Sequence, residues 1–311
     1  MKIERLDIDA EIRKLDWNRE PKGLYEPIGY ALAAGGKRIR PKLALLGALA
    51  VGRNEKDVLP AALALEVFHN FTLLHDDVMD KAEVRRGRPT VHVKWNENTA
   101  ILSGDQMMIE AYKLLSRVPE DKLPKVLRMF NKMATEICEG QQLDVDFEQR
   151  NDVTIAEYME MIRLKTSVLL ATALQIGAYI ANGTDEEQQA LYDYGINLGL
   201  AFQIQDDYLD CFGDPETFGK AIGGDIREGK KTWLWLTAHA TGSETAALLD
   251  HCAGNVEEVL RMYEETGVKK AAEEEIARLT KKAMACLEVL KENKATKALK
   301  TLAEKLAARN K

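Results

Sequence analysis

Two groups of aspartates are the side chains in this sequence best suited to chemistry. Each group has the spacing DDxxD, and the six residues are Asp76, Asp77, Asp80, Asp206, Asp207 and Asp210. In a helix, the first and last acids of such a group share a face and lie roughly 6 Å apart along the axis. Carboxylates this close repel one another, and Mg²⁺ prefers such hard oxygen ligands while keeping part of its water shell. A single DDxxD is more often a solvated helix end, but two copies at the ends of apolar runs favour a metal site.

Basic residues in four other segments could bind an anion that such a metal would share. The segments are GGKRIRP, the RRGRP stretch after the first acids, RLKTS, and the glycine-rich stretch 212–232. The basic residues in them that could reach an anion are Lys37, Arg38, Arg40, Arg85, Arg86, Arg88, Lys165, Lys220, Lys230 and Lys231. Lys165 enters a strongly apolar helix, where a buried lysine is costly without an anionic partner. Acids and cations together predict a diphosphate substrate.

His69 lies seven residues before Asp76, about two helical turns, and could face the same cavity. On its own, a single histidine in an apolar helix is more often a hydrogen-bonded core residue. The stretch 224–230 matches GxxxxGK, but Lys231 stands where a P-loop needs Ser or Thr, and no hydrophobic strand precedes it. We therefore predict a mobile phosphate lid at 212–232 instead of a P-loop.

The composition excludes several classes of protein. A net charge of −7 argues against a broad nucleic-acid surface, which needs a basic face. The four cysteines are scattered without a CxxC pair, as is typical of reduced thiols in the cytosol. The first residues lack the apolar core of a signal peptide, and the apolar run 168–181 is too short to span a bilayer. We expect a cytoplasmic protein with no transmembrane segment.

Long i, i+3, i+4 apolar patterns and few prolines predict helices almost throughout, with no convincing strand. The expected helices include 58–80, 98–115, 123–147, 154–182 and 186–210, with a loop at 82–93. No repeat or linker is evident, so the simplest prediction is an all-α protein with one domain, residues 1–311.

Several motifs in a fixed order resemble those of the trans-isoprenyl diphosphate synthases, or polyprenyl synthetases, over nearly the whole chain. They are GGKRIRP, LLHDDVMD, RRGRPT, GDQ, GQQLD, LKT, FQIQDDYLD and GKAIGGDIREGKKTW. The resemblance implies a helical bundle around a deep central cavity, with the two aspartate motifs facing each other near its mouth, and a homodimer. It also implies head-to-tail condensation of isopentenyl diphosphate with dimethylallyl, geranyl or farnesyl diphosphate. About three Mg²⁺ ions would bind in each active site.

Site roles follow from the same resemblance, residue by residue. All six aspartates would hold the metals, and Lys165 would join Asp76, Asp77, Asp80, Asp206 and Asp207 in catalysis. The residues implied to contact the allylic diphosphate are Arg85, Lys165, Thr166, Gln203, Lys220 and Lys230. Those implied to bind isopentenyl diphosphate are Lys37, Arg40, His69 and Arg86. No protein base is evident for the final proton loss, which the released diphosphate would accept.

In the family that this sequence resembles, product length depends on the residues just before the first aspartate motif. Phe71 stands five positions before Asp76, with the small Thr72 after it, a pattern that resembles the geranylgeranyl-forming type. Farnesyl-forming relatives without an insertion tend to have aromatics at both positions. A helical wheel at about 100° per residue places Phe71 away from the carboxylate face. We favour a C20 product and keep C15 open.

Three other functions compete with this interpretation. A class I terpene cyclase shares the first motif but normally has an Asn/Ser/Glu-type second metal site, unlike FQIQDDYLD. A His-Asp phosphohydrolase could use His69 and the His75-Asp76 pair but would leave the lysines unexplained. A non-catalytic subunit of a heteromeric synthase tends to lose aspartates, and none is missing here.

Overall fold

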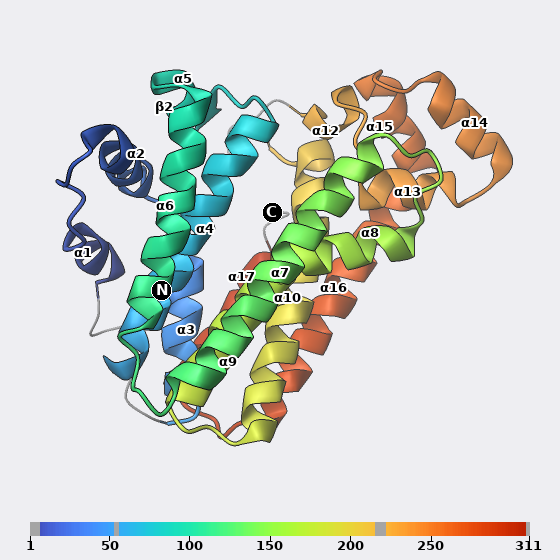
Figure 1. Ribbon diagram of the computed structural model, residues 1–311. Helices are drawn as coiled ribbons and strands as arrows, with labels where there is room; N and C mark the ends of the chain where they lie inside the picture. The colour runs from blue at the N-terminus through green and yellow to red at the C-terminus, as the bar shows by residue number, and fades with distance from the viewer. Residues whose placement is uncertain (1–6, 53–55, 215–221, 309–311) are drawn as a thin grey trace. The chain divides into compact units, whose positions relative to one another are not determined.

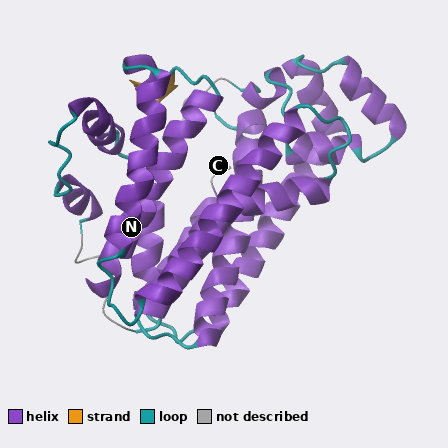
Figure 2. Ribbon diagram, in the orientation of Figure 1, coloured by secondary structure: helices purple, strands orange, loops and turns teal. Residues whose placement is uncertain are grey.

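The computed structural model of the protein describes residues 7–52, 56–214 and 222–308 (Figure 1). Most of these residues lie in helices, and the strands among them form one short hairpin (Figure 2). The expectation of an all-α fold is therefore confirmed.

Contacts divide the chain into two compact units. The first unit comprises residues 1–129 and 173–188, and the second comprises residues 130–172 and 189–311. The assignment of a single domain stays a prediction.

The first unit holds the segments with the first acid group. Its elements are α1 (Ile8–Arg13), α2 (Lys22–Ala33), α3 (Ile39–Ala50), the 3-10 turn η1 (Lys56–Val58), α4 (Leu59–Met79), β1 (Val84–Arg85), β2 (Arg88–Pro89), α5 (Val91–Lys94) and α6 (Glu97–Leu115). Three further helices have residues in both units: α7 (Leu123–Glu148), α9 (Val168–Ile180) and α10 (Asp185–Phe212).

The second unit holds the second acid group. Its remaining elements are α8 (Ile155–Ile162), the π-helical η2 (Arg163–Ser167), α12 (Gly224–Arg227), α13 (Trp233–His239), α14 (Ser243–His251), α15 (Val256–Glu265), α16 (Val268–Cys286), η3 (Leu287–Val289) and α17 (Lys294–Ala307).

The core of the first unit is α4, which packs against α3 and α6. Leucine and alanine dominate its first half, and Pro60 occupies the first turn, where its missing N–H leaves no helix hydrogen bond unmade. Nearly every residue from position 61 to 70 is buried, so this helix is apolar on all sides. The rigid core helix then carries the first acid group at its carboxyl end.

By length and composition alone, one helical segment among the described residues, Lys56–Met79, could cross a membrane. Among the described residues, the candidate for a membrane-spanning helix is therefore this segment and not the run at 168–181. The protein itself buries 67% of the apolar window, as is typical of a core helix. The expected lack of a transmembrane segment stays a prediction.

The backbones of α3 and α9 touch within the first unit because glycines face each other's helix. A Cβ added at Gly47 would lie 2.2 Å from the Leu174 carbonyl oxygen, and one added at Gly177 would lie 1.9 Å from that of Ala44. No side chain fits at either position, so these two glycines set the distance between the helices.

In the second unit, α16 packs against α13, α15 and α17. The fully buried Tyr194 of α10 donates its hydroxyl hydrogen bond to the Leu299 carbonyl of α17 at 2.8 Å. Capping boxes begin α8 at Thr154 and α17 at Asn293, which satisfies the exposed N–H groups of their first turns. These contacts hold the scaffold that carries α10.

Two predictions of local structure are wrong. The helix expected at 154–182 is interrupted by the π-helix Arg163–Ser167, which tertiary packing imposes on an otherwise helical pattern. The loop expected at 82–93 contains the β1–β2 hairpin and α5. Its strands have two residues each, too few for an alternating pattern, and Arg86 and Gly87 form the turn with positive φ angles of 53° and 72°.

Candidate active site

The first acid group lies at the carboxyl end of α4. The middle acid, Asp77, is 4% exposed, and its Oδ1 accepts a hydrogen bond from Arg85 Nε at 2.6 Å. Burial raises the pKa of Asp77 above its ordinary value, against the opposing charge of Arg85. This ion pair holds the β1–β2 hairpin against α4. The structure thus pairs an expected metal ligand with an expected diphosphate ligand.

Asp77 and its neighbours face in different directions because successive residues of a helix are about 100° apart. Asp76 lies in the last turn of α4, and Asp80 is the exposed residue that caps it, one turn further on. Asp76 and Asp80 therefore share a face, while Asp77 is turned toward Arg85.

The second acid group repeats this division on α10. Asp207 is 4% exposed, and its Oδ2 accepts hydrogen bonds from the Tyr158 hydroxyl at 2.5 Å and from the Trp233 backbone N–H at 3.1 Å. Burial, with the nearby charge of Asp225, raises the pKa of Asp207 to about 7 despite these hydrogen bonds. Asp207 thereby joins α10 to α8 and to the start of α13.

Asp210, the last acid of the second group, is also bound by the protein. Its Oδ2 accepts a hydrogen bond from the Asp225 N–H at 3.0 Å, and its carbonyl accepts one from the Gly223 N–H at 2.7 Å. Gly223 has a φ of +74°, and a Cβ there would lie 2.5 Å from Val256, which explains a glycine at this position. These contacts dock α12 onto the end of α10.

The donor sets fit Mg²⁺ better than a metal that needs a cage of side chains. Among residues 7–52, 56–214 and 222–308, no three His, Cys, Asp or Glu side chains come close enough to hold a metal alone. Mg²⁺ usually takes one or two carboxylates and completes its shell with water and substrate phosphate. Each acid group offers carboxylate oxygens of this kind, so the chemistry of the donors suits a metal that arrives with a diphosphate.

The π-helix η2 presents Lys165 and Thr166. Gly140 of α7 lets this segment approach, since a Cβ there would lie 2.4 Å from the Lys165 backbone nitrogen. One turn further along α7, Asp144 Oδ2 lies 2.5 Å from Lys165 Nζ. Sequence reasoning required an anionic partner for Lys165, and the structure supplies Asp144.

A chain of hydrogen bonds connects this segment to the second acid group. Thr166 Oγ1 donates to Gln203 Oε1 at 3.1 Å, and Gln203 Nε2 lies 3.5 Å from Asp207 Oδ1. Lys165, Thr166 and Gln203 were expected to share one ligand. Thr166 and Gln203 lie in this network within the second unit, and Lys165, the residue before Thr166, pairs with Asp144.

The glycine-rich stretch places its lysines differently. Lys220 lies outside the described residues. Lys230 Nζ lies 2.8 Å from Glu228 and 3.6 Å from Asp225, with half of its side chain exposed. Lys231 donates to the carbonyls of Phe147 and Glu148 and so caps the carboxyl end of α7. Lid motion in this stretch stays a prediction.

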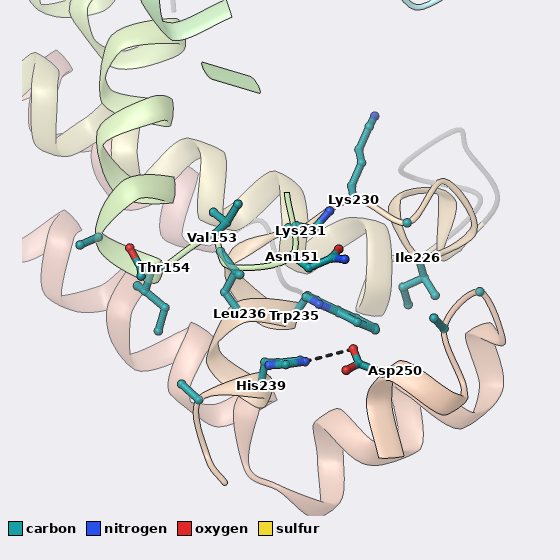
Figure 3. Close-up of a pocket in the computed structure, with 16 residues that line it drawn as sticks. Asn151, Val153, Thr154, Ile226, Lys230, Lys231, Trp235, Leu236, His239 and Asp250 are labelled. Carbon is teal, nitrogen blue, oxygen red and sulfur yellow. Dashed lines mark hydrogen bonds and ion pairs between the residues drawn. The ribbon is translucent and has the colours of Figure 1, made fainter. Parts of the chain in front are cut away.

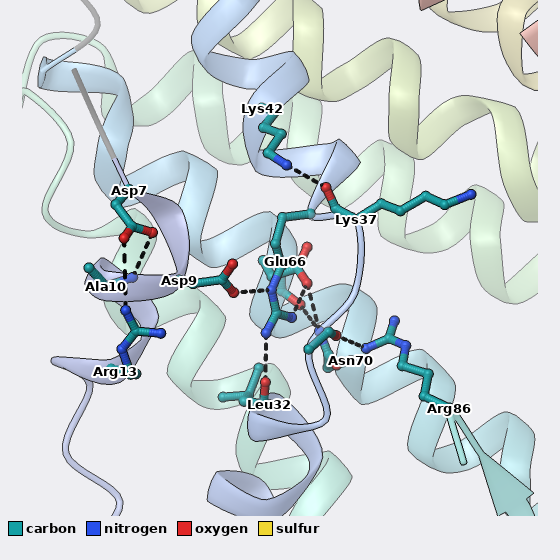
Figure 4. Close-up of polar contacts among 12 residues, drawn as sticks. Asp7, Asp9, Ala10, Arg13, Leu32, Lys37, Lys42, Glu66, Asn70 and Arg86 are labelled. Carbon is teal, nitrogen blue, oxygen red and sulfur yellow. Dashed lines mark hydrogen bonds and ion pairs between the residues drawn. The ribbon is translucent and has the colours of Figure 1, made fainter. Parts of the chain in front are cut away.

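In the first unit, the expected ligands of the second substrate form a cationic cluster. Arg86 donates from Nη1 to the Gly35 carbonyl (Figure 4). Arg40 lies in the first turn of α3 with its Nε buried. Arg40 Nε has no hydrogen-bond partner in the described part of the chain. Burial, together with repulsion from Arg86, lowers the pKa of Arg40 to about 10. Such a cluster is a site for an anion.

His69 projects from α4 into this positive field. Burial lowers the pKa of His69 far below its ordinary value, and the charges of Arg40, Arg86, Arg85 and Arg38 lower it further. The ring is therefore neutral at physiological pH and offers one donor and one acceptor. Lys37 is exposed in the loop before α3 and points away from Glu66 (Figure 4).

The chain-length candidates lie on the face of α4 that meets α6. The Phe71 ring packs edge-on against His75, with 4.8 Å between centroids, and lies 5.4 Å from Phe68. A Cβ at Gly104 of α6 would lie 2.4 Å from His75, so that glycine makes room for the imidazole. Thr72 donates its hydroxyl to the His69 carbonyl at 2.9 Å. Phe71 is thus turned away from the acids, as the helical wheel predicts.

Residues 21–266 match the family model for polyprenyl synthetase. The chain belongs to the polyprenyl synthetase family. It is 47% identical over 237 residues to the geranylgeranyl diphosphate synthase of Methanosarcina mazei, covering 76% of this chain and 73% of that protein. It is 41% identical to the short chain isoprenyl diphosphate synthase of Methanothermobacter thermautotrophicus, covering 95% of this chain and 93% of the relative.

A solved structure agrees with this membership. The crystal structure of geranylgeranyl pyrophosphate synthetase from Pyrococcus horikoshii superposes with a TM-score of 0.92 at 38% identity, covering 96% of this chain and 94% of that one. The resemblance inferred from the motifs is therefore confirmed. The roles of individual residues in this synthetase stay predictions.

The second unit also has a pocket of about 790 Å³ whose lining includes Asn151, Trp235 and Leu236 (Figure 3). None of the six aspartates lines it, and Lys230 is the one expected ligand that does. In Figure 3, Lys230 extends away from the His239–Asp250 pair, in which His239 Nε2 lies 3.0 Å from Asp250 Oδ1. The pocket is thus distinct from the acid groups of the synthetase.

Sequence reasoning missed several residues that hold the site together. Tyr158, Asp144, Arg38 and Glu66 were not singled out as partners of charged groups. Only the motif GQQLD offered a signal, since it places Asp144 on one face of a helix with Gln141. The others became evident only from contacts between distant segments.

The neutral state of His69 can be measured. Across about pH 5.5 to 8, its ring resonances should not shift, because burial and the arginines keep the proton off. Proton–carbon NMR on the labelled protein gives these resonances, and the His69→Gln spectrum assigns them. A titration of the His69 signal with a midpoint near 6.5 would contradict this placement.

Proposed function

We propose that this protein is a short-chain prenyltransferase that condenses isopentenyl diphosphate with dimethylallyl, geranyl and farnesyl diphosphates, with geranylgeranyl diphosphate as the main product. One observation carries the proposal. Hard carboxylates suited to Mg²⁺ and cations suited to diphosphate occur together in a chain of the polyprenyl synthetase family.

The reaction places clear demands on such residues. The carbon–oxygen bond of the allylic diphosphate breaks, a carbon–carbon bond forms to the isopentenyl double bond, and a proton leaves the adjacent carbon. Negative charge grows on the departing diphosphate, and fixed cations stabilise it in a water-poor site. Bound Mg²⁺ would supply further positive charge to that leaving group. The released diphosphate would accept the proton.

The assignment of residues follows the resemblance of the motifs. Arg85, Lys165, Thr166, Gln203, Lys220 and Lys230 would bind the allylic diphosphate. Lys37, Arg40, His69 and Arg86 would bind isopentenyl diphosphate, with neutral His69 donating one hydrogen bond. The facing of the two aspartate motifs across a central cavity belongs to this proposal as well.

We divide the six aspartates by their burial, because Asp77, Asp207 and Asp210 are buried and the other three are not. Asp76, Asp80 and Asp206 would ligate Mg²⁺, about three ions per site. Asp77, Asp207 and Asp210 would act from behind, because one oxygen of each is bound by the protein: Asp77 Oδ1 by Arg85, Asp207 Oδ2 by Tyr158 and Asp210 Oδ2 by the Asp225 N–H. Carboxylates that are held by the protein behind the metal ligands fix the geometry of the residues that hold the metal.

The proposal includes a homodimer, supported by an exposed apolar face on α6. Leu102 is 59% exposed and Ile109 is 48% exposed, and Ile101, Met108 and Tyr112 lie beside them at helical spacing. Met107 is buried in the core, and Met108 belongs to the exposed face. A contiguous apolar stripe is typical of a subunit contact. Sedimentation velocity would measure the mass of the proposed homodimer.

We also place the protein in the cytoplasm.

The function is tested with purified protein, Mg²⁺, isopentenyl diphosphate and each of the three allylic primers, with products identified by mass. Every primer should be extended, with C20 dominant.

Asp76→Asn should lower turnover about 100-fold or more and raise the Mg²⁺ requirement, because a metal ligand is lost. Asp77→Asn should keep the Mg²⁺ requirement while weakening the Arg85 contact. A wild type that extends no primer would refute the function.

Phe71→Ala should shift the main product beyond C20, because removing the ring opens space along the path of the growing chain. Thr72→Phe should shift it toward C15, and Phe71→Tyr, which keeps the ring, should leave it at C20. The three variants are compared with the wild type by mass analysis of dephosphorylated products. An unchanged distribution in Phe71→Ala would remove Phe71 from the control of chain length.

A further inference from the structure

The loop that carries Lys37 and Arg40 is held by a third basic residue between them. Arg38 is 4% exposed, and three of its N–H groups are engaged (Figure 4). Nη1 donates to Glu66 at 2.7 Å, Nη2 to the Leu32 carbonyl at 2.6 Å, and Nε to Asp9 at 2.9 Å. A side chain so deeply committed cannot reach a substrate, so Arg38 serves the loop itself.

The backbone at Arg38 requires this anchoring. Its φ of 49° is in the left-handed region, which costs a non-glycine residue free energy. Arg38 also occupies the N-cap position of α3, directly before the turn that contains Arg40. Contacts from Glu66 and Asp9 that hold Arg38 in this conformation therefore fix the positions of both neighbouring cations.

Glu66 is a shared counter-ion for the cationic cluster. Its carboxylate is 2% exposed, and Asn70 Nδ2 donates to it at 3.2 Å. Burial by itself would lower the pKa of Arg38, Arg40 and Arg86, and the charge of Glu66 raises it in each. One buried acid thus offsets the repulsion among three arginines.

The remaining partner comes from α1. Ile8 and Ile12 bury one side of this helix, and α1 packs against α4. On its edge, Asp9 remains half exposed and accepts the Arg38 Nε hydrogen bond. The family match begins at residue 21, so it assigns nothing to α1.

We infer that Asp9 and Arg38 are positioning residues, through which α1 holds the Lys37–Arg40 loop in the geometry that binds the second diphosphate. The inference rests on the proposed function, because it concerns the substrate that this loop would bind. It predicts that α1 affects the binding of isopentenyl diphosphate and does not affect the binding of the allylic diphosphate. Arg86, held against the Gly35 carbonyl, ties the hairpin to the same loop.

The test compares two isosteric charge removals on α1. Asp9→Asn weakens the contact to Arg38, and Glu11→Gln removes a carboxylate that pairs with Lys14 at 2.7 Å instead. In Asp9→Asn, the KM for isopentenyl diphosphate should rise about 5-fold or more, as for other residues that orient ligand-binding groups. Its kcat and the KM for the allylic substrate should stay within about 2-fold of the wild type, and Glu11→Gln should match the wild type throughout.

Arg38→Lys provides a second measurement. It keeps a positive charge but loses the fork that reaches Asp9, Glu66 and Leu32 together, so the same KM should rise further. Asp9 is half exposed, so its variant should fold even if Arg38→Lys does not. An unchanged KM for isopentenyl diphosphate in Asp9→Asn overturns the inference. So does an equal rise in the KM for both substrates, because that marks a general structural defect.

Failure of the proposed function would be seen separately. A wild type that makes no product refutes the function, and the inference is then decided by calorimetric titration with inorganic diphosphate without metal. Binding that is about 5-fold weaker in Asp9→Asn than in Glu11→Gln supports the inference. Equal affinity overturns it.

Discussion

In this protein, side chains with charges of the same sign lie close together even without a ligand. Side chains of opposite charge in the same chain offset the repulsion between them. Glu66 and Asp9 hold Arg38, Arg85 is held by Asp77, and Lys165 is held by Asp144. A buried charge without a partner is strongly destabilising, and a buried pair with satisfied hydrogen bonds is tolerated. Each pair also joins two different structural elements. The neutralising contacts therefore position the groups that the proposed reaction needs.

The same need to pair charges explains why the acids within each DDxxD motif have different surroundings. In both DDxxD groups the second acid is buried and bound by the protein, by Arg85 in one and by Tyr158 and the Trp233 N–H in the other. Helix geometry turns this acid about 100° from the first, toward the scaffold. The first acid of each motif lies on the other face of its helix. We propose that the motif combines residues for the metal with residues that fix the helix, and this division deepens the family assignment.

Much of the fold follows from the sequence because apolar periodicity is a local property. The helices expected at 98–115, 123–147 and 186–210 appear as α6, α7 and α10, with ends that differ by at most two residues. The π-helix at 163–167 could not be predicted in this way, since it depends on the contact with Gly140 of α7. Site residues were recognisable by type and motif. Their partners, such as Tyr158 for Asp207 and Asp9 for Arg38, were not, because each pair forms between segments far apart in the chain.

A crystal structure with Mn²⁺ and an unreactive thio-analogue of the allylic diphosphate tests the central claim most directly. Anomalous scattering locates Mn²⁺, which replaces Mg²⁺ at oxygen sites. The account predicts that Mn²⁺ is ligated by Asp76, Asp80 and Asp206, while the Asp77–Arg85 and Asp207–Tyr158 contacts remain. Ligation of the metal by Asp77 or Asp207, with those contacts broken, would contradict the division of the acids into metal ligands and residues that support them.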